Sequence, residues 1–211
     1  YFDISSDTDL VDRFLKQLPA QAKILDIGCG PGNFTQYLVS KGFQVEGIDI
    51  AEEMLRVART HLPQVTFTQG DLSALPYPDQ SFDAVFSAYS LIHVAQADIT
   101  KTIIGLQRIL TSEGLVFVLV QKGTSDHLIA EPLMPERQNF VNFFSLDNLV
   151  QDFQANGFTI KEHIEIPISD PDNLVARARR VKDLHYAHVA AREANRLNGG
   201  HSQLPLGQTW T

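Results

Sequence analysis

The sequence is poor in residues that crosslink a chain or anchor it in a membrane. Cysteine occurs once, as Cys29, so no disulfide can form within the chain and no cysteine-rich zinc site exists. No run of 18 apolar residues is present, which excludes a conventional membrane-spanning helix. The first residues, Tyr1-Phe2-Asp3-Ile4, lack the pattern of a signal peptide. We therefore expect a soluble cytoplasmic protein that makes no contact with a membrane.

Basic residues are also scarce. The 17 lysines and arginines are outnumbered by 25 acidic residues, and the formal net charge is −8. A wide nucleic-acid-binding face needs clustered cations, so we expect no nucleic-acid partner. The cations are unevenly distributed, because residues 173–211 hold six basic and two acidic residues. This segment is explained either by a solvated surface or by a docking face for an acidic partner.

Short apolar runs alternate with stretches of helical spacing over the first 121 residues. Strands are predicted at residues 23–27, 43–48, 65–69, 82–87 and 115–120. Helices are predicted at residues 32–41, 51–61 and 96–110. Strands that alternate with helices imply a mostly parallel sheet with right-handed crossovers. The 211 residues are therefore expected to form one α/β unit, with an appendage at most.

The pattern weakens after Gln121. A helix is predicted from Ser145 to Gly157, and a strand over residues 158–166. No regular element is predicted between residues 122 and 144, although this stretch, like residues 1–11, is a candidate to cover a bound substrate.

Two interpretations of the C-terminal part remain open. Asp170-Pro171 is a typical helix start, and the residues up to Asn198 suit one long helix. Alternatively, Asn173–Arg180 is a last strand that pairs with the preceding one. We divide the chain into a domain over residues 1–172 and a C-terminal segment over residues 173–211, which ends in a loose tail.

A glycine-rich turn follows the first predicted strand. Residues 24–32 read Ile-Leu-Asp-Ile-Gly-Cys-Gly-Pro-Gly, so the glycines from Gly28 onward fall two positions apart. Glycines let a ligand approach the backbone closely, and open α/β sheets bind ligands at the carboxyl ends of their strands. The dinucleotide fingerprint requires a third glycine where this chain has Asn33. The preceding carboxylate, Asp26, suits a cationic ligand better than a pyrophosphate.

Acidic residues also follow the second and third predicted strands. Asp49 ends the second strand, where a carboxylate accepts hydrogen bonds from the hydroxyls of a ribose. Asp71 follows the third strand, where it would either accept from the exocyclic amine of an adenine or cap the next turn. The ligand so described carries a ribose, an adenine and a cationic part, and it requires no phosphate.

Taken in order, these segments resemble the class I S-adenosylmethionine-dependent methyltransferases, especially the branch that modifies small molecules. Residues 24–35 resemble the first motif of the family, and residues 45–55 resemble its second acidic motif. Residues 69–94 resemble its third and fourth strands, and residues 108–114 the turn before its fifth. The resemblance covers about residues 10–165.

The resemblance implies a Rossmann-like, doubly wound, mostly parallel sheet of seven strands with helices on both faces. It also implies S-adenosylmethionine as cofactor, S-adenosylhomocysteine as product and a small-molecule methyl acceptor. The family ends on an antiparallel seventh strand, which only Asn173–Arg180 is expected to provide here. A cofactor-binding module without catalysis, or an NAD-dependent oxidoreductase, remains an alternative, and the oligomeric state is not predicted.

The resemblance assigns candidate residues to the cofactor. They are Asp26, Gly28, Cys29, Gly30, Asp49, Ile50, Met54, Asp71, Leu72 and Ser87. Asp26 is expected near the methionine amino group, and the backbone amide of Leu72 near the adenine. Ile50 and Met54 either pack on the adenine or belong to the core.

Tyr89 and His93 are the candidate catalytic residues. They lie four positions apart, so they would share a face on a helical turn. Either side chain would serve as a general base if the acceptor loses a proton, although His93 is equally explained as a structural histidine. His185 and His188 would share a face of the alternative C-terminal helix. No carboxylate or cysteine accompanies them in a ligand pattern, so no metal site is expected.

Overall fold

The computed structural model describes residues 3–123, 126–131, 134–167 and 184–192. The strands of its main sheet are β1 (Lys23–Ile27), β2 (Gln44–Asp49), β3 (Thr66–Gln69), β4 (Phe82–Ala88), β5 (Leu110–Gln121), β8 (Phe158–Pro167) and β9 (Leu184–Arg192). The helices are α1 (Thr8–Leu15), α2 (Asn33–Ser40), α3 (Glu52–His61), α4 (Gln96–Ile109) and α5 (Leu146–Ala155). Two 3-10 turns are η1 (Leu72–Ala74) and η2 (Leu91–His93).

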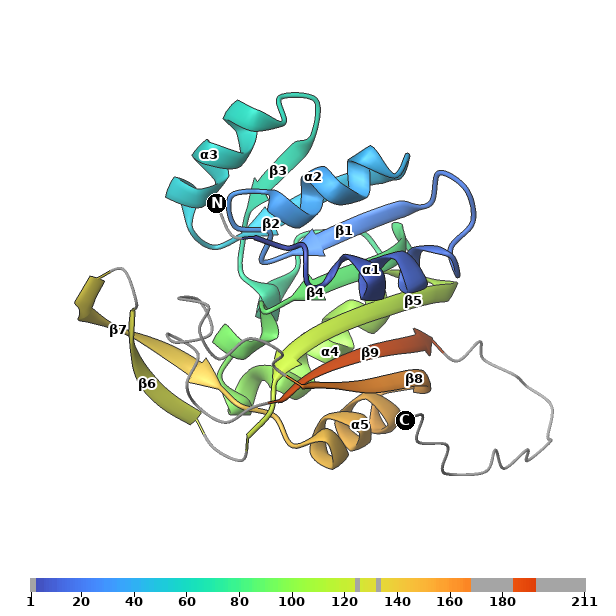
Figure 1. The fold of residues 1–211 in the computed structure, drawn as a ribbon. Helices are drawn as coiled ribbons and strands as arrows, with labels where there is room; N and C mark the ends of the chain where they lie inside the picture. Colours follow the sequence, from blue (N-terminus) through green and yellow to red (C-terminus); the bar gives the residue numbers. More distant parts are fainter. Residues whose placement is uncertain (1–2, 124–125, 132–133, 168–183, 193–211) are drawn as a thin grey trace.

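Five parallel strands form the sheet in the order β3-β2-β1-β4-β5, and the antiparallel strands β9 and β8 follow beside β5 (Figure 1). The mostly parallel α/β sheet predicted from the alternating pattern is therefore confirmed, and so is the Rossmann-like fold that the resemblance implied. β1 pairs with β2 on one side and with β4 on the other, so the winding of the chain reverses at β1. Open α/β sheets bind their ligands in the crevice at such a switch point.

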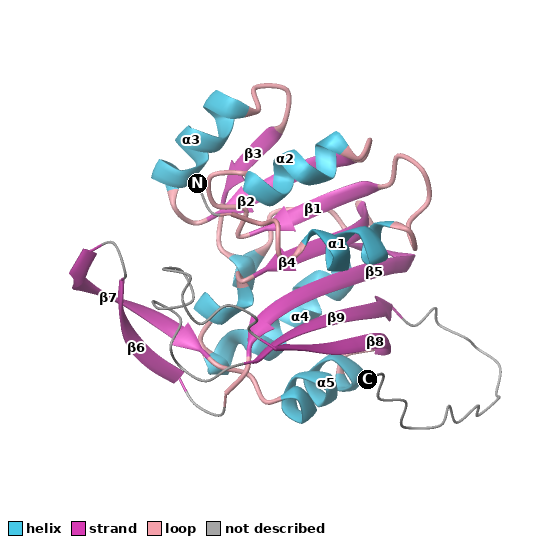
Figure 2. Cartoon of the chain, viewed as in Figure 1, coloured by secondary structure: helices cyan, strands magenta, loops and turns pink. Residues whose placement is uncertain are grey.

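Helices cover both faces of the sheet (Figure 2). α1 and α2 pack on one face, where Phe14 and Leu38 join Phe86 of β4. α4 and α5 pack on the other, where Ile103 joins Val85. Adjacent residues of β4 thus face opposite layers, as the alternation of a strand requires. The central strands are therefore apolar almost throughout, because both of their faces are buried.

The C-terminal part differs from the sequence interpretation. A helix up to Asn198 is wrong for Leu184–Arg192, because these residues form β9 between β5 and β8. The residues are good helix formers, but β5 offers backbone groups that β9 pairs from Leu115 to Gln121, and tertiary pairing overrides local propensity. Asn173–Arg180 lies outside the described residues. The division of the chain at residues 172 and 173 stays a prediction.

His185 and His188 lie in β9, so the helix on which they were expected to share a face does not form there.

Two features were not predicted from the pattern. α1 packs against the sheet through Val11, Phe14 and Leu15. Strands β6 (Asp126–Glu131) and β7 (Met134–Asn142) form a hairpin that leaves the sheet after β5 and extends away from it (Figure 1). At the base of the hairpin, the side-chain amide of Asn142 donates to the carbonyl oxygen of Val94, the residue just after η2, at 3.2 Å.

We predict that Phe86→Ala lowers the stability of the fold strongly. The Phe86 ring is fully buried and stacks on Phe117 with 4.9 Å between ring centroids. Truncating a buried phenylalanine costs about 3–5 kcal/mol, through lost burial and the cavity left behind. Urea unfolding measures the change. Ile104→Ala, at a side chain that is 51% exposed on α4, should change the free energy of unfolding by less than about 0.5 kcal/mol. Equal losses in the two variants would contradict the packing described.

Candidate functional site

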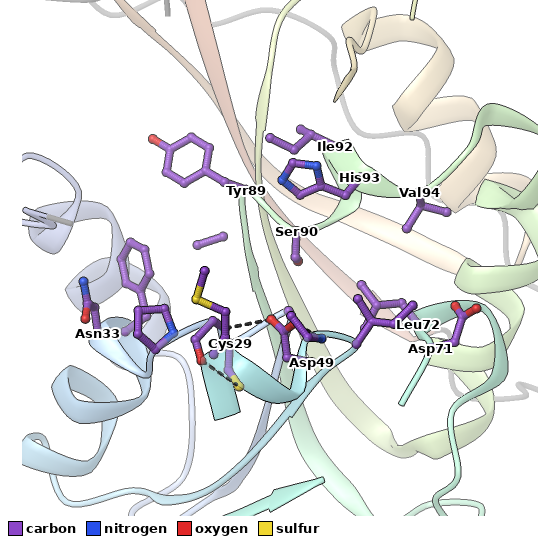
Figure 3. A pocket seen from close by; sticks show the side chains of 18 of the residues that line it. Cys29, Asn33, Asp49, Asp71, Leu72, Tyr89, Ser90, Ile92, His93 and Val94 are labelled. Atoms are coloured by element: carbon purple, nitrogen blue, oxygen red, sulfur yellow. Dashed lines mark hydrogen bonds between the residues drawn. The ribbon is translucent and has the colours of Figure 1, made fainter. Parts of the chain in front are cut away.

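A cavity of about 900 Å³ lies at the carboxyl ends of β1, β2 and β4. This volume is at the upper end of the range of about 300–1,000 Å³ that is typical of small-ligand sites. Figure 3 shows Cys29 and Asp49 on one side of it and Tyr89 and His93 on another. The cavity therefore occupies the switch point of the sheet, where the sequence motifs converge.

The glycine turn forms one wall of the cavity. Its backbone is held against the end of β2, because the amides of Gly28 and Cys29 donate to the carbonyl oxygen of Ile48 at 2.7 and 3.1 Å. Gly28 has a φ of +64°, and a Cβ on it would lie 2.3 Å from the Cβ of Ser90. Gly30 has a φ of +53°, but a Cβ there would meet no atom within 4 Å. The first glycine is needed for packing as well as conformation, and the second leaves room for a ligand.

Asp49 joins the turn to the end of β2. Its Oδ2 accepts a hydrogen bond from the Gly30 amide and its Oδ1 accepts one from the Ala51 amide, both at 2.8 Å. A carboxylate oxygen accepts more than one hydrogen bond, so both oxygens keep capacity for ligand hydroxyls. The two backbone bonds fix the carboxylate in place at the cavity wall before any ligand binds.

Ile50, Met54, Asp71 and Leu72 also line the cavity. The interpretation of Ile50 and Met54 as core residues is wrong, because their exposed fractions are 68% and 44%. Two exposed apolar side chains beside a cavity provide a surface on which a planar ring can pack. Asp71 Oδ1 accepts from the Ser73 amide at 2.8 Å, so this residue caps η1 as well as facing the cavity.

Asp26 and Ser87 are not among the residues that line the cavity. Asp26 is 2% exposed and accepts a hydrogen bond from the Thr35 hydroxyl at 2.6 Å. Burial raises the pKa of Asp26 to about 7; the Thr35 bond opposes this shift, and the charge of Asp49 adds to it. Ser87 is fully buried, and its Oγ lies 2.7 Å from that of Ser90. Both predicted residues thus stand behind the wall that they support.

Cys29 lines the cavity but is buried to 7% exposure. Burial raises the pKa of its thiol, and the carboxylates of Asp26 and Asp49 add to the effect. A thiol that resists ionisation is a poor nucleophile. The geometry therefore favours the packing role over a nucleophilic one.

The opposite wall brings Tyr89 and His93 to the cavity, as predicted, but not on one helical turn. Tyr89 has a φ of +57° and precedes η2, which contains His93. The Tyr89 hydroxyl lies 3.3 Å from Oδ2 of Asp7. Asp3 and Asp7 bring the N-terminal stretch to the cavity, in agreement with the expectation that residues 1–11 are a candidate to cover a bound substrate.

Ser90 is a further lining residue that sequence reasoning missed. Its side chain fills the space that the missing Cβ of Gly28 leaves. No local pattern marks this serine, because its role depends on a strand brought beside β1 by the fold.

Known proteins resemble this chain in both sequence and fold. Residues 24–114 match the family model described as a methyltransferase domain. A methyltransferase of Synechocystis without an assigned substrate is 32% identical over 53% of this chain and 52% of its own length. The malonyl-[acyl-carrier protein] O-methyltransferase of Erwinia billingiae is 29% identical over 89% of this chain and 74% of its own length.

Solved structures show the same fold. A methyltransferase from Methanosarcina mazei superposes with a TM-score of 0.76, covering 87% of this chain and 98% of that one, at 21% identity. Identity this low shows the fold alone.

Residues 24–114 are thus similar to a methyltransferase domain, and the fold is that of a solved S-adenosylmethionine-dependent methyltransferase, in agreement with the resemblance of the ordered motifs. The matched segment spans 52%, 60% and 42% of three of its curated relatives, roughly half of their length. The cavity fits the nucleoside cofactor of this family in its donor set, because it joins an open glycine backbone to the carboxylate of Asp49. No helix in the described part of the chain is long and apolar enough to cross a membrane.

We predict that Asp26→Asn changes the pH dependence of stability. The folded pKa of Asp26 is raised from 3.8 to about 7, so the folded state holds this proton more tightly than the unfolded state does. The contribution of Asp26 is therefore most favourable below pH 3.8 and is lost as the pH rises through 7. Relative to the wild type, the variant should gain stability between about pH 5 and pH 8 in urea unfolding.

The control is Asp147→Asn, at an exposed position on α5. It should keep the wild-type slope of stability against pH. A wild-type and an Asp26→Asn curve that run parallel would refute the raised pKa.

Proposed function

We propose that this protein transfers the methyl group of S-adenosylmethionine to a small-molecule acceptor and releases S-adenosylhomocysteine. The observation that carries the proposal is the glycine turn at the cavity wall, where the Gly30 amide donates to the Asp49 carboxylate and a Cβ on Gly30 would meet no atom within 4 Å. The family match and the relatives named as methyltransferases support it. We also propose that β8 and β9 complete the seven-stranded sheet of the family, since they cover the open edge of β5.

Each predicted cofactor residue receives a role in the proposal. The Asp49 carboxylate accepts from the ribose hydroxyls, and Ile50 and Met54 pack on the adenine, toward which Asp71 and the Leu72 amide also face. The turn from Gly28 to Gly30 carries the methionine part, with Cys29 packed beneath it. Asp26 and Ser87 act from behind the wall: Asp26 holds the first turn of α2 through Thr35, and Ser87 holds Ser90.

When bound, S-adenosylmethionine supplies an activated methyl group on a sulfonium, whose departing thioether is neutral. The protein therefore has mainly to align the acceptor and to exclude water. Tyr89 and His93 are proposed to hold or remove the acceptor proton, because both side chains face the cavity opposite the glycine turn (Figure 3). We propose that the protein has no nucleic-acid partner and makes no contact with a membrane. Its cytoplasmic location stays a prediction.

We predict that Asp49→Ala weakens the binding of S-adenosylmethionine at least tenfold. The variant loses hydrogen bonds to a charged group, each worth about 1.5–3 kcal/mol, and releases the Gly30 amide. Isothermal titration calorimetry with S-adenosylmethionine and S-adenosylhomocysteine measures the loss. Asp49→Asn, which keeps one acceptor oxygen, should bind with intermediate affinity.

The exposed Asp147→Asn, which also removes one negative charge, serves as the control and should bind as the wild type does. Absence of binding by the folded wild type, or an Asp49→Ala variant of unchanged affinity, would sink the cofactor assignment. Conversion to S-adenosylhomocysteine with an acceptor panel separates an enzyme from a binding module. A titration with NADH, for which no binding is expected, tests the oxidoreductase alternative.

A further inference from the structure

We propose that the methyl acceptor carries a positive charge, such as a protonated amine, and that Asp7 is the residue that selects it. This inference rests on the proposed function, since it concerns the acceptor side of the same cavity. The charge is a recognition element, and the methyl transfer itself is the step proposed above.

The geometry of Asp7 is the first argument. Asp7 precedes the first residue of α1 and occupies its N-cap position. Aspartate at this position usually accepts a hydrogen bond from the helix backbone, but the Asp7 side chain makes no capping bond. Its carboxyl instead lies beside the Tyr89 hydroxyl, 3.5 Å from Oδ1 and 3.3 Å from Oδ2, and faces the cavity. The side chain thus forgoes a stabilising local contact for a position at the cavity wall.

The fixed position of Asp7 is the second argument. Its carbonyl oxygen accepts from the amides of Leu10 and Val11, both at 3.1 Å, so the backbone is part of the first turn of α1. The residue is only 9% exposed, which limits the water available to screen its charge. Tyr89 is held as well, because its amide donates to the carbonyl oxygen of Leu119 at 2.8 Å. A carboxylate whose own backbone and whose neighbouring tyrosine are both held in place discriminates between charged ligands better than a mobile carboxylate does.

The balance of charge in the cavity is the third argument. Asp3 and Asp98 line it together with Asp7, and the described lining residues include no lysine or arginine. Among the described residues that line the cavity, His93 is the one histidine. A buried charge needs a partner of opposite sign. An acceptor with a free carboxylate would face these acids, and the described lining offers it no lysine or arginine.

A cationic acceptor would distinguish this chain from its relative in Erwinia billingiae. That protein is named for a malonyl group, which ends in a carboxylate. Sharing a cofactor half does not require sharing an acceptor half, because function depends on the residues placed on the fold.

The test uses cofactor analogues, so that no acceptor need be known. Two analogues are compared. In each of them, a nitrogen replaces the sulfur of S-adenosylhomocysteine and carries a third arm that enters the acceptor half of the cavity. One arm is 3-aminopropyl, which ends in an ammonium group, and the other is 2-carboxyethyl, which ends in a carboxylate. The matched N-methyl analogue is the reference. Calorimetry measures the three affinities.

We predict that the wild type binds the ammonium analogue at least about tenfold more tightly than the carboxylate analogue. Asp7→Asn should reduce this ratio about tenfold, while affinity for the N-methyl reference stays within about twofold. Asp7→Glu, which keeps the charge, should restore most of the ratio. Asp9→Asn, at an exposed position outside the cavity lining, is the matched control and should keep it.

A merely structural Asp7 would change all three affinities together. Equal or tighter binding of the carboxylate analogue by the wild type would overturn the inference and leave the proposed function intact. An unchanged ratio in Asp7→Asn would remove Asp7 as the selecting residue. Failure of the N-methyl reference to bind the wild type would instead remove the proposed function, and the inference with it.

Discussion

The site depends on one constraint: the glycine turn after β1 is held to the end of β2 by its own amides. Gly28 and Cys29 donate to the Ile48 carbonyl oxygen, and Gly30 donates to the Asp49 carboxylate. The positive φ angles of the glycines let the chain turn sharply enough to make these bonds. Because Asp49 is bonded to the turn, the groups proposed to contact ribose and methionine are fixed relative to each other before the cofactor arrives.

The same turn couples the cofactor half to the acceptor half. Gly28 packs directly against Ser90, and Ser90 bonds to Ser87 at the end of β4. Tyr89 lies between these serines in a left-handed conformation that a tyrosine rarely adopts. The side chains of Ser87 and Ser90 are buried against each other, whereas the Tyr89 hydroxyl lies beside Asp7 at the cavity. A larger residue at position 28 would therefore disturb both halves, through the end of β4.

The strands and turns around the proposed cofactor half were predicted well, because they are built from local signals. β1 has the predicted bounds of Lys23–Ile27, and Asp49 and Asp71 stand at strand ends next to turn residues. β9 was not predicted correctly, since its residues favour a helix until β5 offers them a partner strand. Asp26 illustrates a subtler limit. Motif position placed it with the ligand, whereas strand alternation turns its side chain toward Thr35 of α2.

The acceptor half escapes local pattern for a physical reason. Asp7 and Tyr89 are separated by 82 positions and meet only because α1 packs on the face of the sheet that Phe86 and Phe117 fill. The hairpin β6–β7 reaches η2 in the same way, through Asn142 and Val94, 48 positions apart. Neither contact leaves a motif, since each partner is an ordinary residue in its own segment. In the proposed site, consecutive strand ends hold the cofactor, and segments that the fold assembles around them meet the acceptor. Charge at such assembled positions, as at Asp7, is where relatives with one cofactor can diverge in the molecules they accept.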